Sequence, residues 1–209
     1  VCSSDLMKKP IEYFYSAYSA YAYIGHSDFL KLASDSEREV IHRPFDLMKC
    51  LNAIGYHPLE ERTDEALSYQ FGRQRDRWSE FRNVPMPKET PSSHNNGAEI
   101  ADLVLLASIK NGEDIQKLSS EFMKRHWLKN LDLSDEQAVH NTLIDLGLEA
   151  STLIMEAKSQ SILKEYEKNT EFAIKHSVFG SPTYFVDGDM FYGQDNLPLV
   201  ERALERAFK

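Results

Sequence analysis

Segments with strand character lie only near the two ends of this chain, and this distribution limits the folds it can adopt. Residues 11–15 (Ile-Glu-Tyr-Phe-Tyr) and 39–43 (Glu-Val-Ile-His-Arg) are short runs rich in β-branched and aromatic residues, which predicts two strands. Between them, residues 20–32 predict a helix, because apolar residues fall near one face and no proline interrupts the run. The N-terminal part is therefore predicted to be β-α-β.

The C-terminal part predicts two further strands and a helix. Residues 183–186 and 190–192 have strand character, and the Asp-Gly pair between them is typical of a tight hairpin turn. A last helix is predicted from an apolar stripe that runs from Leu197 to Phe208. The order at this end is β-β-α.

The long middle segment, residues 46–177, contains no convincing strand. Apolar residues keep helical spacing over 115–122 and 139–146, and Ser134 with Gln137 predicts a capping box at the start of the second helix. A segment of this length is not a loop, so we predict an inserted all-helical subdomain.

The predicted fold class is α/β, with a core domain of residues 11–45 and 178–209 and a helical insertion of residues 46–177. The strands on either side of the insertion must meet to complete one sheet. We therefore expect the insertion to pack over the N-terminus of the first helix and to wall a site there.

Composition and charge exclude several classes of function. The formal net charge is −9, and a polyanion such as DNA would be repelled by it. No run of about 18 apolar residues is present, so no membrane span is predicted. The histidines are scattered without metal-ligand spacing, and His94 is interpreted as a loop residue rather than a ligand. We expect no nucleic-acid partner, no membrane partner and no metal.

The cysteines indicate the compartment. Cys2 falls in residues 1–10, which we interpret as a non-native or disordered extension; the first six residues resemble a translated cloning adapter, and a disordered native tail is the alternative. Cys50 alone cannot form an internal disulfide or a CxxC pair, which indicates a reducing compartment. Because no secretory signal follows Met7, the prediction is cytoplasmic. Cys50 is interpreted as a small buried hydrophobe.

Two motifs carry the chemistry. Ser19 stands where the first strand passes into the first helix, and a helix N-terminus stabilises an anion through its free N–H groups and dipole. The alternative is that Ser19 only caps the helix. The second motif is the run from Phe179 to Phe185, in which Pro182 follows a Gly-Ser turn at the start of a strand. It predicts a cis Ser181–Pro182 bond, with an ordinary trans bond as the alternative.

With the order β-α-β, helices, β-β-α, these motifs form the thioredoxin arrangement, and the chain resembles the 2-hydroxychromene-2-carboxylate isomerase family. That family is similar to kappa-class glutathione transferases and to DsbA-type oxidoreductases. The resemblance covers nearly all of residues 11–208. The segments that carry it are Ile11-Glu-Tyr-Phe-Tyr, Ser19-Ala-Tyr-Ala-Tyr-Ile-Gly25, His42-Arg-Pro44 and Val178 to Asp195.

The resemblance implies glutathione as cofactor and assigns site residues. Ser19 would hold the glutathione thiol and favour its thiolate. The other glutathione-binding residues that it implies are Ala20, Tyr21, Ser181, Pro182, Gln194 and Asp195. Asp195 would receive the α-ammonium of the γ-glutamyl end, as a charged acceptor should; the alternative is a cap of the last helix.

The chain departs from the family pattern at two positions. Ala20 follows Ser19 where relatives usually have proline, and Tyr56 follows Gly55 where they often have asparagine. The expected substrate-pocket residues are Tyr23, Tyr56, Arg75 and Trp78. Arg75 belongs to a cluster of arginines around Trp78 that is either a solvated face or the holder of a substrate carboxylate.

The leading functional hypothesis is a glutathione-dependent isomerase of 2-hydroxychromene-2-carboxylate type, acting in aromatic degradation. A thiolate would add reversibly to the substrate, allow bond rotation and be expelled. The alternatives are a kappa-like glutathione transferase and a catalytically silent thioredoxin-fold binding protein. The expected partners are a small aromatic or electrophilic substrate and a second copy of the chain in a homodimer.

Overall fold

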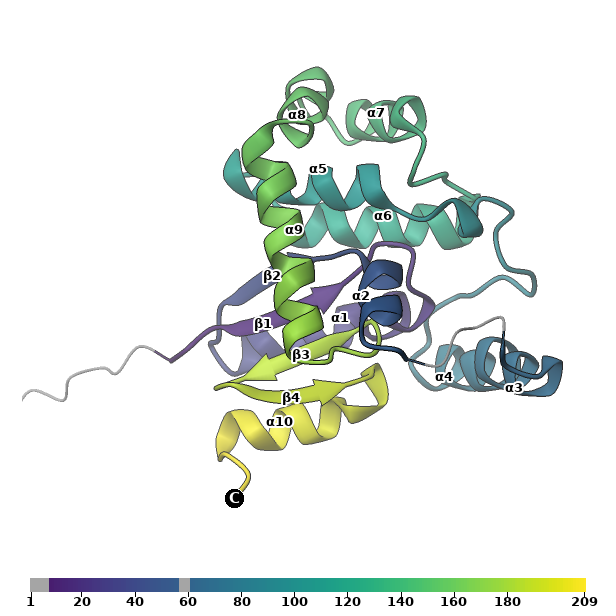
Figure 1. Cartoon of the computed structure of the whole chain (residues 1–209), viewed down its shortest axis with the longest axis vertical. Coiled ribbons are helices and arrows are strands. Elements are labelled where there is room, and N and C mark those ends of the chain that lie inside the picture. Colours follow the sequence, from purple (N-terminus) through teal and green to yellow (C-terminus); the bar gives the residue numbers. More distant parts are fainter. Residues whose placement is uncertain (1–7, 57–60) are drawn as a thin grey trace, which may run out of the picture.

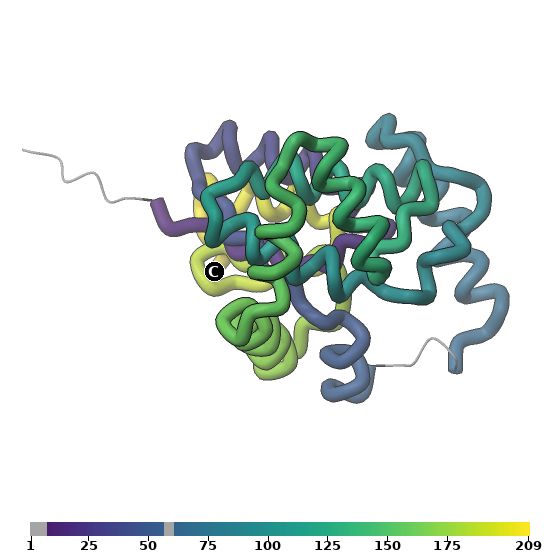
Figure 2. Tube along the Cα trace, turned by 90° about the horizontal axis from the view of Figure 1, so that it is seen from above, coloured from purple at the N-terminus to yellow at the C-terminus, as the bar shows by residue number. Residues whose placement is uncertain are grey.

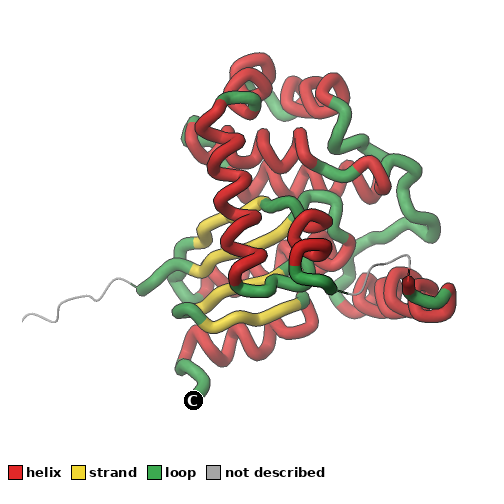
Figure 3. The backbone as a smooth tube through the Cα atoms, in the orientation of Figure 1, coloured by secondary structure: helices red, strands yellow, loops and turns green. Residues whose placement is uncertain are grey.

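The computed structural model describes residues 8–56 and 61–209, so most of the expected N-terminal extension lies outside the described residues. A four-stranded sheet lies in the middle of the molecule with helices on both of its faces (Figures 1 and 3). The elements, in chain order, are β1 (Ile11–Tyr15), α1 (Ala20–Asp35), β2 (Val40–Pro44), α2 (Leu47–Ala53), α3 (Asp64–Ser68), η2 (Tyr69–Gln74), α4 (Arg75–Phe81), η3 (His94–Asn96), α5 (Glu99–Lys110), α6 (Ile115–Lys129), α7 (Glu136–Asp145), α8 (Ala150–Ala157), α9 (Gln160–Lys175), β3 (Thr183–Val186), β4 (Asp189–Tyr192), η4 (Gln194–Asn196) and α10 (Leu197–Glu205).

The two ends of the chain meet in one sheet, as predicted. The strand order is β2-β1-β3-β4. β1 and β2 are parallel, with Tyr13 opposite His42, and α1 makes the crossover between them. β1 and β3 are antiparallel, with Tyr13 opposite Tyr184, and β4 continues the hairpin. Segment 16–19 follows the C-terminal end of β1, and segment 180–182 precedes the N-terminal end of β3. Because these strands are antiparallel neighbours, both segments lie at the same end of the sheet.

Alternation along the strands directs side chains to two cores. Tyr13 and Tyr15 face α1, where the Tyr13 ring stacks on Tyr184 at 5.4 Å between centroids. Phe14 points to the opposite face and joins a smaller core with residues of α2 and α9, such as Phe172. Figure 1 shows α2 and α9 lying over this second face. Burial on both faces explains why β1 is apolar or aromatic at every position except Glu12, which is partly buried and pairs with Arg43 of β2.

The predicted hairpin turn is confirmed. Asp187 and Gly188 have φ of 53° and 93°, so both turn residues lie in the left-handed region that a two-residue hairpin of this type requires. The Asp187 carboxylate also pairs with Arg38 at 3.0 Å.

The helical segment packs on the sheet and on itself. Within the described residues, no strand interrupts 46–177, as predicted. One continuous core joins the sheet to α5, α6 and α8, which stack above it in Figure 1 and lie toward the viewer in Figure 2. The prediction that 46–177 is a separate subdomain stays a prediction.

Two details of the helix predictions are wrong. Helix α7 begins after Asp135, whose carboxylate accepts from Ala138 N, and Ser134 instead donates its hydroxyl to Asp132. The backbone N–H of Ser134 also donates to Asp132 Oδ1, so Ser134 is held in the turn before the helix and Asp135 provides the cap. The last helix ends at Glu205, so Phe208 lies beyond it and is 44% exposed. No helix in the described part of the chain is long and apolar enough to cross a membrane.

Candidate active site

Ser19 lies at the junction of β1 and α1 and is buried. Its Oγ accepts from Ala22 N at 3.2 Å and donates to the carbonyl of Ser181 at 2.9 Å. The interpretation of Ser19 as a helix cap is therefore confirmed, and its catalytic role stays a prediction. The hydroxyl has one proton, which Ser181 accepts here.

The Ser181–Pro182 segment faces Ser19, and its peptide bond is cis, as predicted. Ser181 Oγ accepts from Ser16 N at 3.2 Å, and the Pro182 carbonyl accepts from Gly193 N at 2.9 Å. The backbone N–H of Ser181 forms no hydrogen bond with any residue that the structure describes. This donor is free for a ligand.

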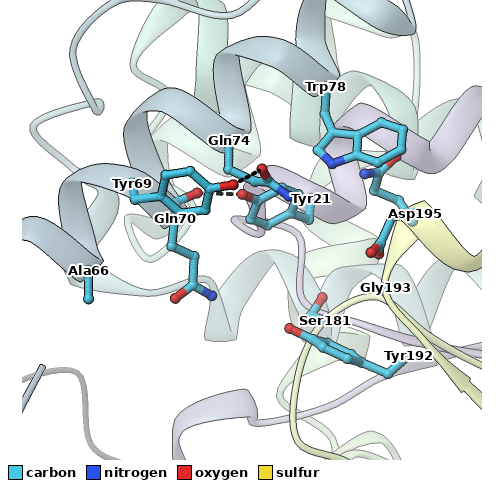
Figure 4. A pocket seen from close by; sticks show the side chains of 11 residues that line it. Tyr21, Ala66, Tyr69, Gln70, Gln74, Trp78, Ser181, Tyr192, Gly193 and Asp195 are labelled. Carbon is cyan, nitrogen blue, oxygen red and sulfur yellow. Dashed lines mark hydrogen bonds between the residues drawn. The ribbon is translucent and has the colours of Figure 1, made fainter.

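Two cavities meet at Ser181. The Asp195 cavity has a volume of about 420 Å³ and is lined by Gln194, Asp195 and Trp78 among others (Figure 4). The Ser19 cavity has a volume of about 480 Å³ and is largely apolar in its lining. Residues that line both cavities are Tyr21, Gln70, Ser181 and Tyr192.

The residues of the site come from two parts of the chain. The floor comes from the segments next to the sheet and consists of Ser19, Ser181, Tyr192, Gln194 and Asp195. The wall comes from the helical segment and consists of Tyr56, Arg75, Trp78, His94 and Trp127. The prediction that the helical segment walls the N-terminus of α1 is confirmed.

Glycines allow two close approaches in the floor. A Cβ on Gly180 would lie 2.1 Å from the Tyr192 ring, so only glycine lets this ring lie against the backbone between the cavities. A Cβ on Gly25 would lie 2.4 Å from Cβ of Gln194, which therefore packs directly on α1.

Asp195 is exposed and points into its cavity (Figure 4). Its carboxylate forms no hydrogen bond or ion pair with any described residue. The last helix has Asn196 at its N-cap, without a side-chain cap bond. The alternative that Asp195 caps this helix is therefore wrong, and its charge remains free for a ligand.

Gln194 is buried and is held by Arg82 of the segment after α4. Arg82 Nη2 donates to the Gln194 carbonyl at 2.6 Å, and Nε donates to its side-chain oxygen. Arg82 also pairs with Asp28 at 2.6 Å and lies 5.3 Å from the Trp78 ring centroid. Arg82 thus joins the helical segment to the floor.

Arg75 is also fixed and buried, with 3% of its surface exposed. Its Nε and Nη2 donate to Asp76, and Nη2 donates to the carbonyls of Pro87 and Lys88. Its Nη1 forms no hydrogen bond within the described residues, and Arg75 lines the Ser19 cavity. The interpretation of the arginine cluster as a solvated face is wrong for Arg75 and Arg82, and Arg73 and Arg77 are exposed.

The remaining predicted pocket residues divide between core and cavities. Tyr23 lies in the core, donates to the Pro85 carbonyl at 3.2 Å and lines neither cavity, which corrects the prediction for it. Its place on α1 turns it away from Ser19 toward the chain after α4. Tyr56 and Ala20 line the Ser19 cavity, Trp78 lines the Asp195 cavity, and Tyr21 lines both. Cys50 is fully buried, as predicted.

Asp102 of α5 holds the loop that precedes Ser19, and the sequence did not predict this role. Its carboxylate accepts from Ser16 Oγ at 2.6 Å and from Ala17 N at 2.9 Å, and so holds the loop that leads to Ser19. Burial raises the pKa of Asp102 from 3.8 to about 8, against these two hydrogen bonds. No local motif marks this residue, because its partners lie 85 and 86 positions away.

His94 and Trp127 also line the Ser19 cavity and were missed. Their rings lie 5.0 Å apart, and the His94 ring lies 5.1 Å from that of Tyr18. His94 is not a simple loop residue, because its Nδ1 is hydrogen-bonded to His126 of α6 at 3.0 Å. Among the described residues, no group of three or more metal-ligating side chains occurs.

The fold and site are those of a thioredoxin-type protein, and comparison with known proteins identifies the family. Residues 10–205 match the model of the DSBA-like thioredoxin domain. The chain therefore belongs to the DSBA-like thioredoxin family.

Curated relatives match this chain in sequence, and solved structures share its fold. The chain is 26% identical to a 2-hydroxychromene-2-carboxylate isomerase of Sphingobium xenophagum, covering 95% of this chain and 99% of the relative. It is 21% identical to a protein of the same name from Pseudomonas putida, covering 94% of each chain. The structure of a 2-hydroxychromene-2-carboxylate isomerase superposes with a TM-score of 0.80 at 22% identity over 94% of each chain. The cytosolic disulfide reductase DsbM of Pseudomonas aeruginosa with GSH superposes with a TM-score of 0.64 at 12% identity, over 95% of this chain and 93% of DsbM.

Proposed function

We propose that this protein is a glutathione-dependent isomerase of 2-hydroxychromene-2-carboxylate type. One observation carries the proposal: Ser19 lies beside Ser181, where a cavity with a free carboxylate meets a larger cavity lined with aromatic rings. A peptide thiol and an aromatic substrate bound side by side would meet there. The names of the curated relatives support this substrate class.

The residues present fit glutathione. Asp195 offers an unpaired carboxylate to an α-ammonium, and the free N–H of Ser181 offers a backbone donor to an extended peptide. Gln194 lines the Asp195 cavity, Ala20 lines the Ser19 cavity and Tyr21 lines both, and with Pro182 they would complete the binding site. The structural relative DsbM has been solved with GSH, which supports the same choice of thiol. Glutathione would supply a thiolate nucleophile that adds reversibly to an electrophilic double bond.

The role of Ser19 is to stabilise that thiolate by a hydrogen bond. The hydroxyl donates to the Ser181 carbonyl in this structure, so it must rotate to reach a ligand sulfur. It can rotate without losing its cap, because it accepts from Ala22 N through a lone pair. A charge-assisted hydrogen bond of about 1.5–3 kcal/mol then replaces a neutral one of about 0.5–1.5 kcal/mol. The N-terminus of α1 adds a smaller stabilisation of negative charge.

Arg75 is the proposed holder of the substrate carboxylate. It is buried at the Ser19 cavity and keeps Nη1 free, while Nε and Nη2 fix the orientation of the guanidinium. Tyr56 would pack on the aromatic part of the substrate, because its ring lines the same cavity next to Phe179 at 5.7 Å. Trp78 would instead lie on the glutathione side.

Location and assembly complete the proposal. The single buried thiol of the described residues suits a reducing compartment, and we propose the cytoplasm. We propose that the protein acts as a homodimer on a small aromatic substrate.

The test is calorimetric titration with glutathione, followed by a spectral assay on 2-hydroxychromene-2-carboxylate with glutathione at catalytic concentration. Turnover without loss of glutathione is expected. Stoichiometric consumption of glutathione would instead indicate a transferase. If neither glutathione nor the chromene carboxylate bound tightly, the protein would be a catalytically silent binding protein.

A further inference from the structure

A chain of hydrogen bonds fixes the protonation of His94 in η3. The Leu131 carbonyl can only accept, so Nδ1 of His126 donates to it at 2.8 Å. In a neutral imidazole the other nitrogen is an acceptor, so His126 Nε2 receives the proton of His94 Nδ1 at 3.0 Å. By the same rule, Nε2 of a neutral His94 carries a lone pair.

The surroundings of His94 keep it neutral. Burial, followed by the neighbouring His126 and Arg75, lowers the pKa of His94 to about 4. The other rings against it are those of Tyr18 and Trp127, at 5.1 and 5.0 Å between centroids. Burial raises the pKa of the Tyr18 phenol, so it carries no charge near neutral pH.

The lone pair on Nε2 has no partner within residues 8–56 and 61–209, and His94 lines the Ser19 cavity. A structural role in the hydrogen bond to His126 accounts for Nδ1 but leaves Nε2 unexplained. A metal site does not account for it either, since no three ligating side chains gather within the described residues. Nε2 is not sealed off from the cavity, so it can accept from water in the free protein and from a hydrogen-bond donor of a bound molecule.

We propose that His94 is a specificity-determining residue that accepts, through Nε2, a hydrogen bond from the hydroxyl group of a hydroxylated aromatic carboxylate. The inference rests on the proposed function, because it names the substrate feature that the same site selects. The cavity offers a neutral acceptor at His94 and a guanidinium at Arg75, which together match a ligand with one hydroxyl and one carboxylate.

The experiment uses two probes that differ by one hydroxyl group, 2-hydroxycinnamate and cinnamate. Each is titrated calorimetrically into the protein with saturating glutathione. His94→Asn keeps an amide donor at the position of Nδ1 for His126 but removes the acceptor from the cavity. His94→Gln places an amide oxygen near the position of Nε2. His176→Asn, at an exposed histidine on the C-cap of α9, is the matched control.

The wild type should bind 2-hydroxycinnamate about five- to tenfold more tightly than cinnamate, which is the effect of one net hydrogen bond. His94→Asn should bring this ratio to about one with cinnamate affinity unchanged. His94→Gln should keep part of the ratio, and the control should keep all of it. A wild-type ratio near one, or an unchanged ratio in His94→Asn, overturns the inference.

Turnover separates this inference from the proposed function. If the wild type isomerises the chromene carboxylate but does not prefer the hydroxylated probe, only the role of His94 is wrong. If the preference is present without turnover, the reaction is wrong and His94 still selects the hydroxyl.

A pH series adds an independent check. The preference should stay constant from about pH 5.5 to 8, because His94 remains neutral over that range. An imidazole with the ordinary pKa of about 6.5 would lose it on acidification, since an imidazolium cannot accept. Collapse of the ratio between about pH 7 and 6 would overturn the inference.

Discussion

The floor and the wall of this site are positioned in different ways. Each floor residue lies within a few residues of a strand end, so the ladder between β1 and β3 places Ser19 opposite Ser181. Four of the five wall residues lie on short helices and turns, and the fifth, Trp127, lies on the longer helix α6. Side-chain clamps hold this part to the floor: Asp102 bonds the loop before α1, and Arg82 bonds Gln194. Under the proposed function, the floor would supply the chemistry, and the clamps would set the position of the substrate relative to the floor.

The clamp at Asp102 should have the largest effect on stability. Its pKa is higher in the folded protein than in the unfolded chain, so the native state binds more protons between about pH 4 and 8, and stability falls as pH rises through that window. Between about pH 5 and 7 this residue should remove roughly 3 kcal/mol from the free energy of unfolding. Asp102→Asn lacks this pH-dependent contribution. Denaturant unfolding should therefore show that the free energy of unfolding of the variant rises relative to that of the wild type as pH increases.

Asp145→Asn, at an exposed carboxylate next to the C-terminus of α7, is the control for that series. Parallel pH curves for the wild type and Asp102→Asn would mean that the buried carboxyl does not hold its proton.

The largest effect on ligand binding is expected in the floor, at Asp195. Replacing the free carboxylate by an amide removes a charge-assisted partner of the glutathione ammonium, which is worth about 1.5–3 kcal/mol or ten- to a hundredfold in affinity. Calorimetry on Asp195→Asn measures this directly. Asp195→Ala should weaken binding as much without loss of stability, since this residue caps no helix.

Asp189→Asn, at an exposed position on β4 outside both cavities, serves as the comparison. Equal glutathione affinity in the wild type and Asp195→Asn would remove Asp195 from the floor of the binding site.

Ser19→Ala tests the chemical role of the floor. In the wild type the hydroxyl gives up its bond to the Ser181 carbonyl when it binds the ligand sulfur, so it should lower the pKa of the bound thiol by about one unit. Removing the hydroxyl should therefore lower the rate near neutral pH about tenfold. Glutathione affinity should barely change, and the rate should recover at higher pH, where the thiol ionises unaided. A pH–rate profile and the ultraviolet absorbance of the thiolate measure both effects.

Ser159→Ala is a matched control, because Ser159 caps α9 in the same way and lies outside both cavities. Both variants should lose about 1 kcal/mol of stability with the cap, but only Ser19→Ala should move the thiolate pKa. Identical profiles for the wild type and Ser19→Ala would leave Ser19 as a cap alone.

Arg82→Lys should have the smallest effect of these substitutions, and the effect should be on glutathione affinity. Lysine keeps the charge next to Asp28 but cannot donate to both oxygens of Gln194 in a planar fork. We expect glutathione affinity to fall severalfold, by about 1 kcal/mol. Arg77→Lys, on an exposed face of α4, should leave it unchanged. If the two variants behaved alike, Arg82 would not tie the wall to the floor.

The floor was predictable because its determinants are local. A polar residue at the start of a helix and a proline after a Gly-Ser turn have meaning within a few residues, and the strand order brings the two segments together. The turn at Asp187 and Gly188 was predictable for the same reason.

The wall was predictable only in part. Tyr56, Arg75 and Trp78 were expected near a pocket, but the contacts that position the rest of the site are tertiary. His94 and Asp102 acquire a role only through partners far away in the sequence, and Gln194 meets Arg82 across 112 positions. Tyr23 was misplaced because it follows Tyr21 by two residues on α1, which puts the two side chains on nearly opposite faces of the helix. The predicted cap at Ser134 was wrong because Asp135, one residue further on, caps α7 instead.

The position of the two tryptophans gives the molecule a built-in optical readout. The sequence contains only two, Trp78 and Trp127, and each lines a different cavity. Trp78 lies by the Arg82 guanidinium, and Trp127 lies against His94. Replacing one indole by phenylalanine leaves a single fluorophore in each variant. Its emission then reports occupancy of one compartment alone, so the order in which thiol and aromatic acid arrive can be followed in real time without any added label.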